Sequence, residues 1–139
     1  MAVITNMTLS NIIFIEGKPE SSDKNDVLRL EGFKPEKNEG SKTLHVTLDF
    51  QLISPKISLL SLRYCLDYSY IDDEDFCHLK AAVILAHAIP LVRELVANIT
   101  MRTQGKIIYL GTINTNDLYQ DYQKRLKKQA TDAKAQTSP

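Results

Sequence analysis

The strongest constraint on the fold is a strict alternation of apolar and polar residues in the middle of the chain. A period of two is the repeat of a β-strand that buries one of its faces. From residue 43 to residue 52 the alternation holds over five pairs, and its apolar members are Leu44, Val46, Leu48, Phe50 and Leu52. It restarts after Pro55, with apolar members at Leu60, Leu62, Tyr64, Leu66, Tyr68 and Tyr70. Because only a short connection separates the two strands, we expect an antiparallel hairpin.

Two more strands are expected before this hairpin. Residues 7–15 carry β-branched side chains and end at a turn with glycine and proline, and a shorter strand is expected at 27–33, before Pro35. The stretches 19–26 and 36–42 are polar and predict loops. Four strands therefore precede the first helical pattern.

After residue 71 the apolar period changes from that of a strand to that of a helix. The acidic run 72–75 stands where carboxylates stabilise a helix start. Helices are expected at 75–86 and 88–103, with Pro90 in the first turn of the second. Strands followed by helices predict an α+β domain, in which a four-stranded antiparallel sheet carries C-terminal helices on one face.

The C-terminal part of the chain is more polar than the rest. Asn114 is expected to cap a last helix that begins near Asp117. Residues 123–139 predict a basic, disordered tail that follows a single domain over 1–122.

The charge of the chain is balanced overall but unevenly distributed. It has 17 basic and 17 acidic residues, of which 121–139 hold five basic and two acidic ones. This leaves 17 − 5 = 12 basic and 17 − 2 = 15 acidic residues in 1–120. A balanced charge argues against direct nucleic-acid binding. The apolar run 81–88 is too short for membrane insertion, and Cys65 and Cys77 fit a reducing compartment, so we expect a cytoplasmic protein.

The sequence shows no motif for catalysis or for metal binding. Nucleotide-binding glycine loops and the signatures of serine hydrolases and zinc proteases are missing. Cys65, Cys77 and His78 lack the close spacing of a structural zinc site. We therefore expect no enzymatic activity, no cofactor and no metal.

The predicted sheet has more apolar residues than helices on one face can cover. The residues expected on the open face are Leu9, Ile13, Ile15, Leu59 and Val27. Exposed apolar surface of this kind is typical either of a ligand site or of an interface between copies of the chain.

Residues 87–122 resemble the C-terminal half of the SecB family of protein-export chaperones. The resemblance depends on a Pro-x-x-Arg-Glu motif at the start of a long helix and an Asn-x-x-x-Leu-Tyr motif at the last one. The matching residues are Pro90, Arg93, Glu94, Gly105, Leu110, Ile113, Asn114, Leu118 and Tyr119. In the first strand, Ile12 and Phe14 match an apolar-x-Phe pair, and the similarity spans about residues 7–122.

The resemblance implies a chaperone without a cofactor that holds unfolded or partly folded polypeptide in long apolar grooves. The groove candidates are Ile13, Phe14, Ile15, Leu59 and Leu60. It also implies a homotetramer, a dimer of dimers, with its interface on the helix at 88–103. The expected interface residues are Leu91, Arg93, Glu94 and Leu95.

Three positions depart from the pattern of the export chaperones. In that family, acidic residues on the exposed sheet bind the translocation motor. The corresponding positions here are Asn11, Ile15 and Arg63, which are neutral, apolar and basic. These changes argue against motor binding. They fit the SecB-like proteins that serve one antitoxin in toxin–antitoxin–chaperone systems at least as well as general export.

Two functions remain open at this point. The first is a holdase, either for a dedicated client such as an antitoxin or for Sec-dependent export. The second is a SecB-like scaffold, an interaction subunit of a larger complex without general binding of unfolded protein. Suppression of aggregation by the purified protein separates the two.

Overall fold

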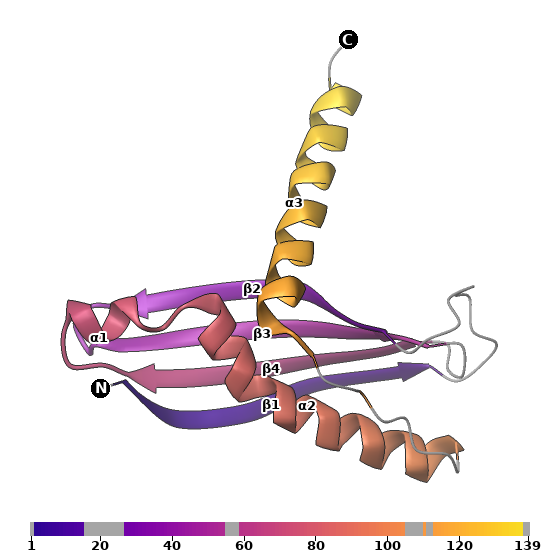
Figure 1. The fold of residues 1–139 in the computed structure, drawn as a ribbon, viewed down its shortest axis with the longest axis horizontal. Helices are drawn as coiled ribbons and strands as arrows, with labels where there is room; N and C mark the ends of the chain where they lie inside the picture. Colours follow the sequence, from indigo (N-terminus) through magenta and orange to yellow (C-terminus); the bar gives the residue numbers. More distant parts are fainter. Residues whose placement is uncertain (1, 16–26, 55–58, 105–109, 111–112, 138–139) are drawn as a thin grey trace.

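The protein folds into one antiparallel sheet and three helices (Figure 1). The computed structural model describes residues 2–15, 27–54, 59–104, 110 and 113–137. The elements are β1 (Val3–Ile15), β2 (Val27–Asn38), β3 (Thr43–Ile53), β4 (Leu59–Ser69), α1 (Asp73–Cys77), α2 (Ala81–Gln104) and α3 (Thr115–Thr137). The strand order is β1-β4-β3-β2, and all neighbouring pairs are antiparallel. The expected α+β architecture and the β3–β4 hairpin are confirmed.

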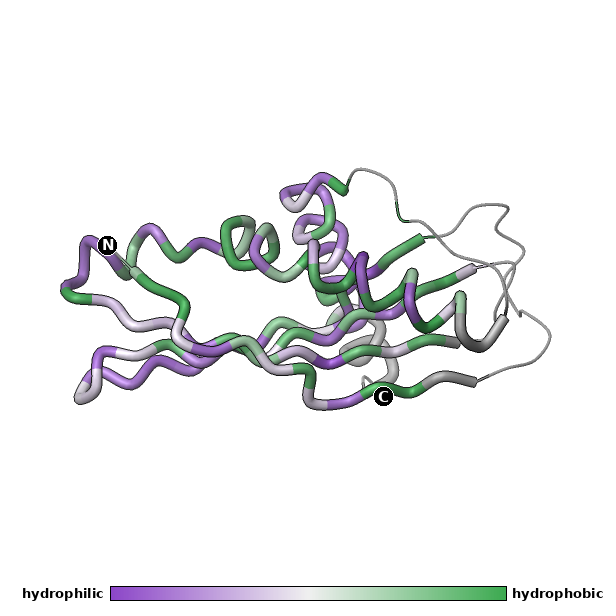
Figure 2. Tube along the Cα trace, turned by 90° about the horizontal axis from the view of Figure 1, so that it is seen from below, coloured by the Kyte–Doolittle hydropathy of each residue, from purple (hydrophilic) through white to green (hydrophobic). Residues whose placement is uncertain are grey.

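The helices lie over one face of the sheet, and α2 crosses that face diagonally (Figures 1 and 2). Every apolar member of the two alternating strands is buried against this layer, as the period of two predicts. From the helices, the core includes Ile84, Leu85, Ala88, Ile89, Val92, Val96 and Leu118. The sheet face turned away from the helices is the open face.

Strand β1 contains two bulges that change which of its residues face the helices. The register shifts at Thr5 and at Ser10, whose hydroxyls donate to the carbonyls of Asp67 (3.2 Å) and Arg63 (3.4 Å). A bulge adds one residue to one strand and so reverses the alternation beyond it. Leu9 consequently packs against the core instead of lying on the open face, where the sequence analysis placed it.

Strand β2 is longer than expected and runs through Pro35 to Asn38. Proline is tolerated there because β2 is an edge strand. The extra residue of its bulge is Glu31, next to Gly32. A Cβ on Gly32 would lie 2.7 Å from an Asp49 carboxylate oxygen, so glycine leaves this carboxylate its place on the open face.

The helical region is interrupted at 78–80, not at residue 87. Helix α1 is a short turn, capped by the Asp72 carboxylate, which accepts from the Asp75 N–H (2.9 Å). Helix α2 is continuous through Pro90, so the expected separate helices at 75–86 and 88–103 are wrong. Pro90 is exposed, and water can satisfy the carbonyl that proline leaves without a donor.

Helix α3 starts two residues earlier than expected and extends much further. The Asn114 side chain accepts from the N–H groups of Asn116 (3.0 Å) and Asp117 (3.2 Å), which confirms its capping role. The helix continues to Thr137, where the sequence analysis expected an unstructured tail from residue 123. Its residues there are mostly strong helix formers.

Candidate functional site

The centre of the open face is a polar surface of paired side chains. Arg63 donates to Asp49 through Nε (2.7 Å) and Nη2 (3.2 Å), and these hydrogen bonds raise the pKa of Arg63 above its ordinary value. His45 and Asp67 form a second pair across the same two strands. Both pairs follow from the β3–β4 register. The positive charge of Arg63 is therefore compensated on the surface itself.

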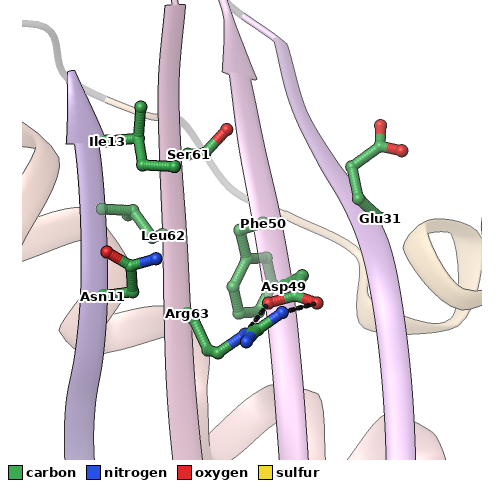
Figure 3. Close-up of a pocket in the computed structure, with 8 residues that line it drawn as sticks. All are labelled: Asn11, Ile13, Glu31, Asp49, Phe50, Ser61, Leu62 and Arg63. Carbon is green, nitrogen blue, oxygen red and sulfur yellow. Dashed lines mark hydrogen bonds and ion pairs between the residues drawn. The ribbon is translucent and has the colours of Figure 1, made fainter.

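A shallow hollow of about 200 Å³ adjoins the Arg63–Asp49 pair (Figure 3). Its lining residues come from all four strands and are Asn11, Ile13, Glu31, Asp49, Phe50, Ser61, Leu62 and Arg63. Ile13 forms an apolar wall, and Arg63 with Asp49 forms a polar one. The small side chain of Ser61 lies between these two walls. The hollow thus offers apolar contact beside polar groups.

Beyond the hollow, the sheet ends in aliphatic residues. We call the following set the aliphatic end: Ile13, Val27 and Ile53 on the open face, Ile12 on the helix side of the same edge, and Ile15 and Leu59 at neighbouring register positions. Ile12 is 41% exposed, Ile13 47% and Val27 36%. The ladder pairs Ile15 with Leu59 and Val27 with Ile53, so the apolar character continues across the width of the sheet.

The predicted groove residues differ in whether the structure exposes or buries them. Ile13 is exposed on the open face, as expected. Leu60 is fully buried under the helices and cannot contact a client in this conformation. Phe14, Ile15 and Leu59 have defined register positions, but their side chains lie outside the described residues.

Two exposed residues of the aliphatic end were not among the predicted groove residues. Ile12 pairs with Leu62 on the helix side of the sheet, yet it stays exposed because β1 is an edge strand. Val27 begins the opposite edge strand, β2. In the sequence, the only signal for both residues was an aliphatic side chain near the end of a strand. The strand register places them at the same end of the sheet, on its two edge strands.

The three positions that the resemblance relates to motor binding, Asn11, Ile15 and Arg63, lie on β1 and β4. Asn11 pairs with Arg63 in the ladder, and Ile15 pairs with Leu59 four residues away along each strand. Arg63 faces outwards, in agreement with its position on the polar side of the strand. Its ion pair with Asp49 compensates this positive charge at the sheet surface.

Helix α2 combines a buried stripe with an apolar outer surface. It contains three charged residues, Arg93, Glu94 and Arg102, and is long and apolar enough to span a membrane by length and composition alone. A third of this apolar segment, Ala81–Met101, is buried inside the chain. Val83 (40% exposed) and Met101 (52% exposed) contribute to what remains outside.

The predicted interface residues of α2 are only partly available for a partner. Leu91 and Leu95 already pack against the core of their own chain, Arg93 is half-buried, and Glu94 is exposed. The apolar residues best placed for another molecule are therefore Val83 and Met101, at the two ends of the helix.

Two tyrosines of β4 attach α2 to the sheet. The hydroxyl of Tyr68 lies 2.9 Å from His87 Nδ1, and that of Tyr64 donates to the Leu91 carbonyl (3.4 Å). Burial raises the pKa of Tyr68 to about 12 and also raises the pKa of Tyr64. Both tyrosines therefore stay neutral over the physiological pH range.

Within the described residues, no three His, Cys, Asp or Glu side chains gather closely enough to hold a metal ion. His45 contacts the Asp67 carboxylate, and His87 contacts the Tyr68 hydroxyl.

No protein-family model matches the chain, and neither does any curated protein sequence. Among solved structures, the fold is similar to that of the Mycobacterium tuberculosis SecB-like chaperone Rv1957, solved in complex with a ChAD peptide from the HigA1 antitoxin. The TM-score is 0.59 and the identity 14%, over 81% of this chain and 90% of that one.

A Streptococcus agalactiae protein of unknown function also matches, with a TM-score of 0.47 and 12% identity, over 81% of this chain and 98% of that one. The match to the Mycobacterium structure covers most of both chains. The protein therefore has a SecB-like fold.

Proposed function

We propose that the protein is a chaperone that holds a non-native polypeptide segment on the aliphatic end of its sheet. The observation that carries this proposal is the exposure of Ile13 and Val27 on the open face, where Ile13 also lines the shallow hollow. The SecB-like fold supports it, because the Mycobacterium protein of this fold was solved with a bound antitoxin peptide.

The chemistry of the aliphatic end suits a segment of variable sequence. Contact with exposed aliphatic side chains is non-directional and roughly proportional to the apolar area removed from water. A hollow of about 200 Å³ is too open to select one side chain, but it lets a segment lie across the sheet. Such binding persists in high salt, because screening weakens charge attraction and leaves apolar burial in place.

The client class follows from the open face. At its polar centre the Asp49 carboxylate is paired with Arg63, so this carboxylate is not free to attract a basic motor segment. We therefore favour a dedicated client such as an antitoxin over general export. We place this activity in the cytoplasm, without nucleic acid or membrane.

A homotetramer is part of the same proposal. Helix α2 would form the interface between dimers, with Leu91, Arg93, Glu94 and Leu95 near its middle and Val83 and Met101 at its ends. Only a third of the apolar segment of α2 is buried in its own chain. An apolar helix that leaves the rest of its surface outside is typical of a subunit interface.

The test is suppression of client aggregation, with matched variants on one strand. Ile13→Asp removes an exposed aliphatic residue at the aliphatic end. Val3→Asp makes the same kind of change at the other end of β1, where Val3 is 59% exposed. We expect Ile13→Asp to weaken binding of an apolar peptide about tenfold, and Val3→Asp to leave it unchanged.

Equal behaviour of the two variants would contradict the proposed site. Absence of any aggregation suppression in the unmodified protein would favour the alternative, a SecB-like scaffold subunit that does not handle unfolded chains.

A further inference from the structure

The second half of α3 leaves the body of the protein. The first half lies against β2, where Leu118 is buried and the Tyr122 hydroxyl accepts from the Phe33 N–H (3.3 Å). Arg125 makes the last of these contacts, and all residues from 126 to 131 are exposed. Figure 1 shows the helix continuing away from the sheet from this point.

This projecting half carries uncompensated positive charge. Lys124, Lys127 and Lys128 are exposed, and among the described residues no carboxylate lies within ion-pair distance of them. Their spacing of three and four residues puts them on one side of the helix. That side is opposite the stripe of Leu118, Tyr122 and Arg125 that contacts the body. We call these three lysines the lysine face.

The projecting half of α3 begins close to the aliphatic end. Arg125 donates to the Leu30 carbonyl (2.6 Å) and pairs with Glu31 (2.8 Å), which lines the hollow. Leu30 is three residues from Val27, or about 10 Å along the strand. A polypeptide lying over Val27 therefore reaches the base of the projecting helix within a few residues.

We propose that the lysine face binds acidic residues that flank the apolar segment of the client. This inference rests on the proposed chaperone function and adds the charge of the client to it. Clustered lysines attract carboxylates over about 10 Å at moderate ionic strength, and complementary charge of this kind mainly speeds encounter and selects partners.

The surrounding chemistry favours a polypeptide over a nucleic acid. The aromatic residues of α3, Tyr119 and Tyr122, pack against each other and Tyr119 also packs against Phe33 (ring centroids 5.4 Å apart), so they are not available to stack on bases.

The test uses three labelled peptides that share one apolar core and differ only in flanking glutamate, serine or lysine residues. We expect the glutamate-flanked peptide to bind about five- to tenfold more tightly than the serine-flanked one at low salt. At about 0.5 M salt this preference should disappear, while the serine-flanked peptide keeps its affinity.

The matched variants are Lys124→Gln/Lys127→Gln/Lys128→Gln and, as a control, Lys80→Glu. The first removes three positive charges and keeps good helix formers, which circular dichroism can check. The second changes the charge by two units at an exposed site before α2. The triple variant should lose the preference for glutamate flanks, and the control should keep it.

A preference that survives in the triple variant would overturn the inference. So would displacement of the glutamate-flanked peptide by duplex DNA that binds the lysine face more tightly at the same salt. Failure of the serine-flanked peptide to bind would count against the aliphatic end, not against the lysine face. If only the glutamate-flanked peptide binds, and only with the lysines present, the lysine face is supported and the groove is not.

Discussion

At the residue scale, the pairing of Arg63 with Asp49 compensates two charges of the open face. The bidentate contact and the place that Gly32 leaves for Asp49 together form a neutral ion pair where a free carboxylate would attract a basic partner. We therefore expect no measurable binding of the basic docking segment of the export motor. Arg63→Glu should produce a partial gain of binding, because it places a second carboxylate beside Asp49.

Calorimetric titration with that segment measures both expectations. Micromolar affinity in the unmodified protein would contradict the account and restore general export as the function.

Tyr68 gives a second prediction at this scale. Its hydroxyl bonds to His87, and Tyr68→Phe should lower the free energy of unfolding by about 1 kcal/mol. The pKa of Tyr68 is raised from the ordinary 10 to about 12, so the neutral form is favoured in the folded state. Its contribution is complete below pH 10 and is lost as the pH rises through about 12.

Denaturant titrations at a series of alkaline pH values check this. The stability of Tyr68→Phe should fall less steeply between pH 10 and 12 than that of the unmodified protein, and identical slopes would show that Tyr68 is not the responsible group.

At the element scale, α3 is held to the edge of β2 by few residues. Arg125→Ala removes the bonds to the Leu30 carbonyl and to Glu31, at a cost of about 1–2 kcal/mol to the attachment of the helix. Hydrogen exchange should then become faster over α3 and at Phe33 while the sheet centre keeps its protection. Lys124→Ala, one residue away and exposed, is the control and should change neither.

The elements also show how far the sequence predicts this fold. Strict alternation identified the buried faces of β3 and β4 because burial on one side leaves a period of two without exception. It failed for Leu9, because the bulge at Ser10 is set by pairing with β4, a contact distant in sequence. The continuity of α2 through Pro90 was missed for a similar reason, because the packing of α2 on the sheet outweighs the break that Pro90 suggests.

The candidate site was predictable in part. Ile13 could be assigned to the open face from its strand, but the aliphatic end as a continuous surface depends on the register that joins β1 to β2 through two other strands. The Arg63–Asp49 pair likewise needs the hairpin register, which the sequence leaves open by a residue or two.

At the scale of the whole molecule, the outer surface of α2 predicts self-association. Met101→Asp places a charge on an exposed apolar position and should dissociate the proposed tetramer into dimers without loss of secondary structure. Leu95→Asp should do the same but also lower stability, because Leu95 packs against its own core. Light scattering of the unmodified protein as a monodisperse monomer would contradict this prediction.

The central claim is that the aliphatic end of the sheet holds the client. The most direct test places a photo-crosslinking amino acid at Ile13, or at Val3 as the control on the same strand, and illuminates each protein with an unfolded client. The account predicts that position 13 crosslinks to the client, in 0.5 M salt as well as in low salt, and that position 3 does not. Equal crosslinking from both positions, or crosslinking of position 13 only to a second copy of the chain, would contradict it.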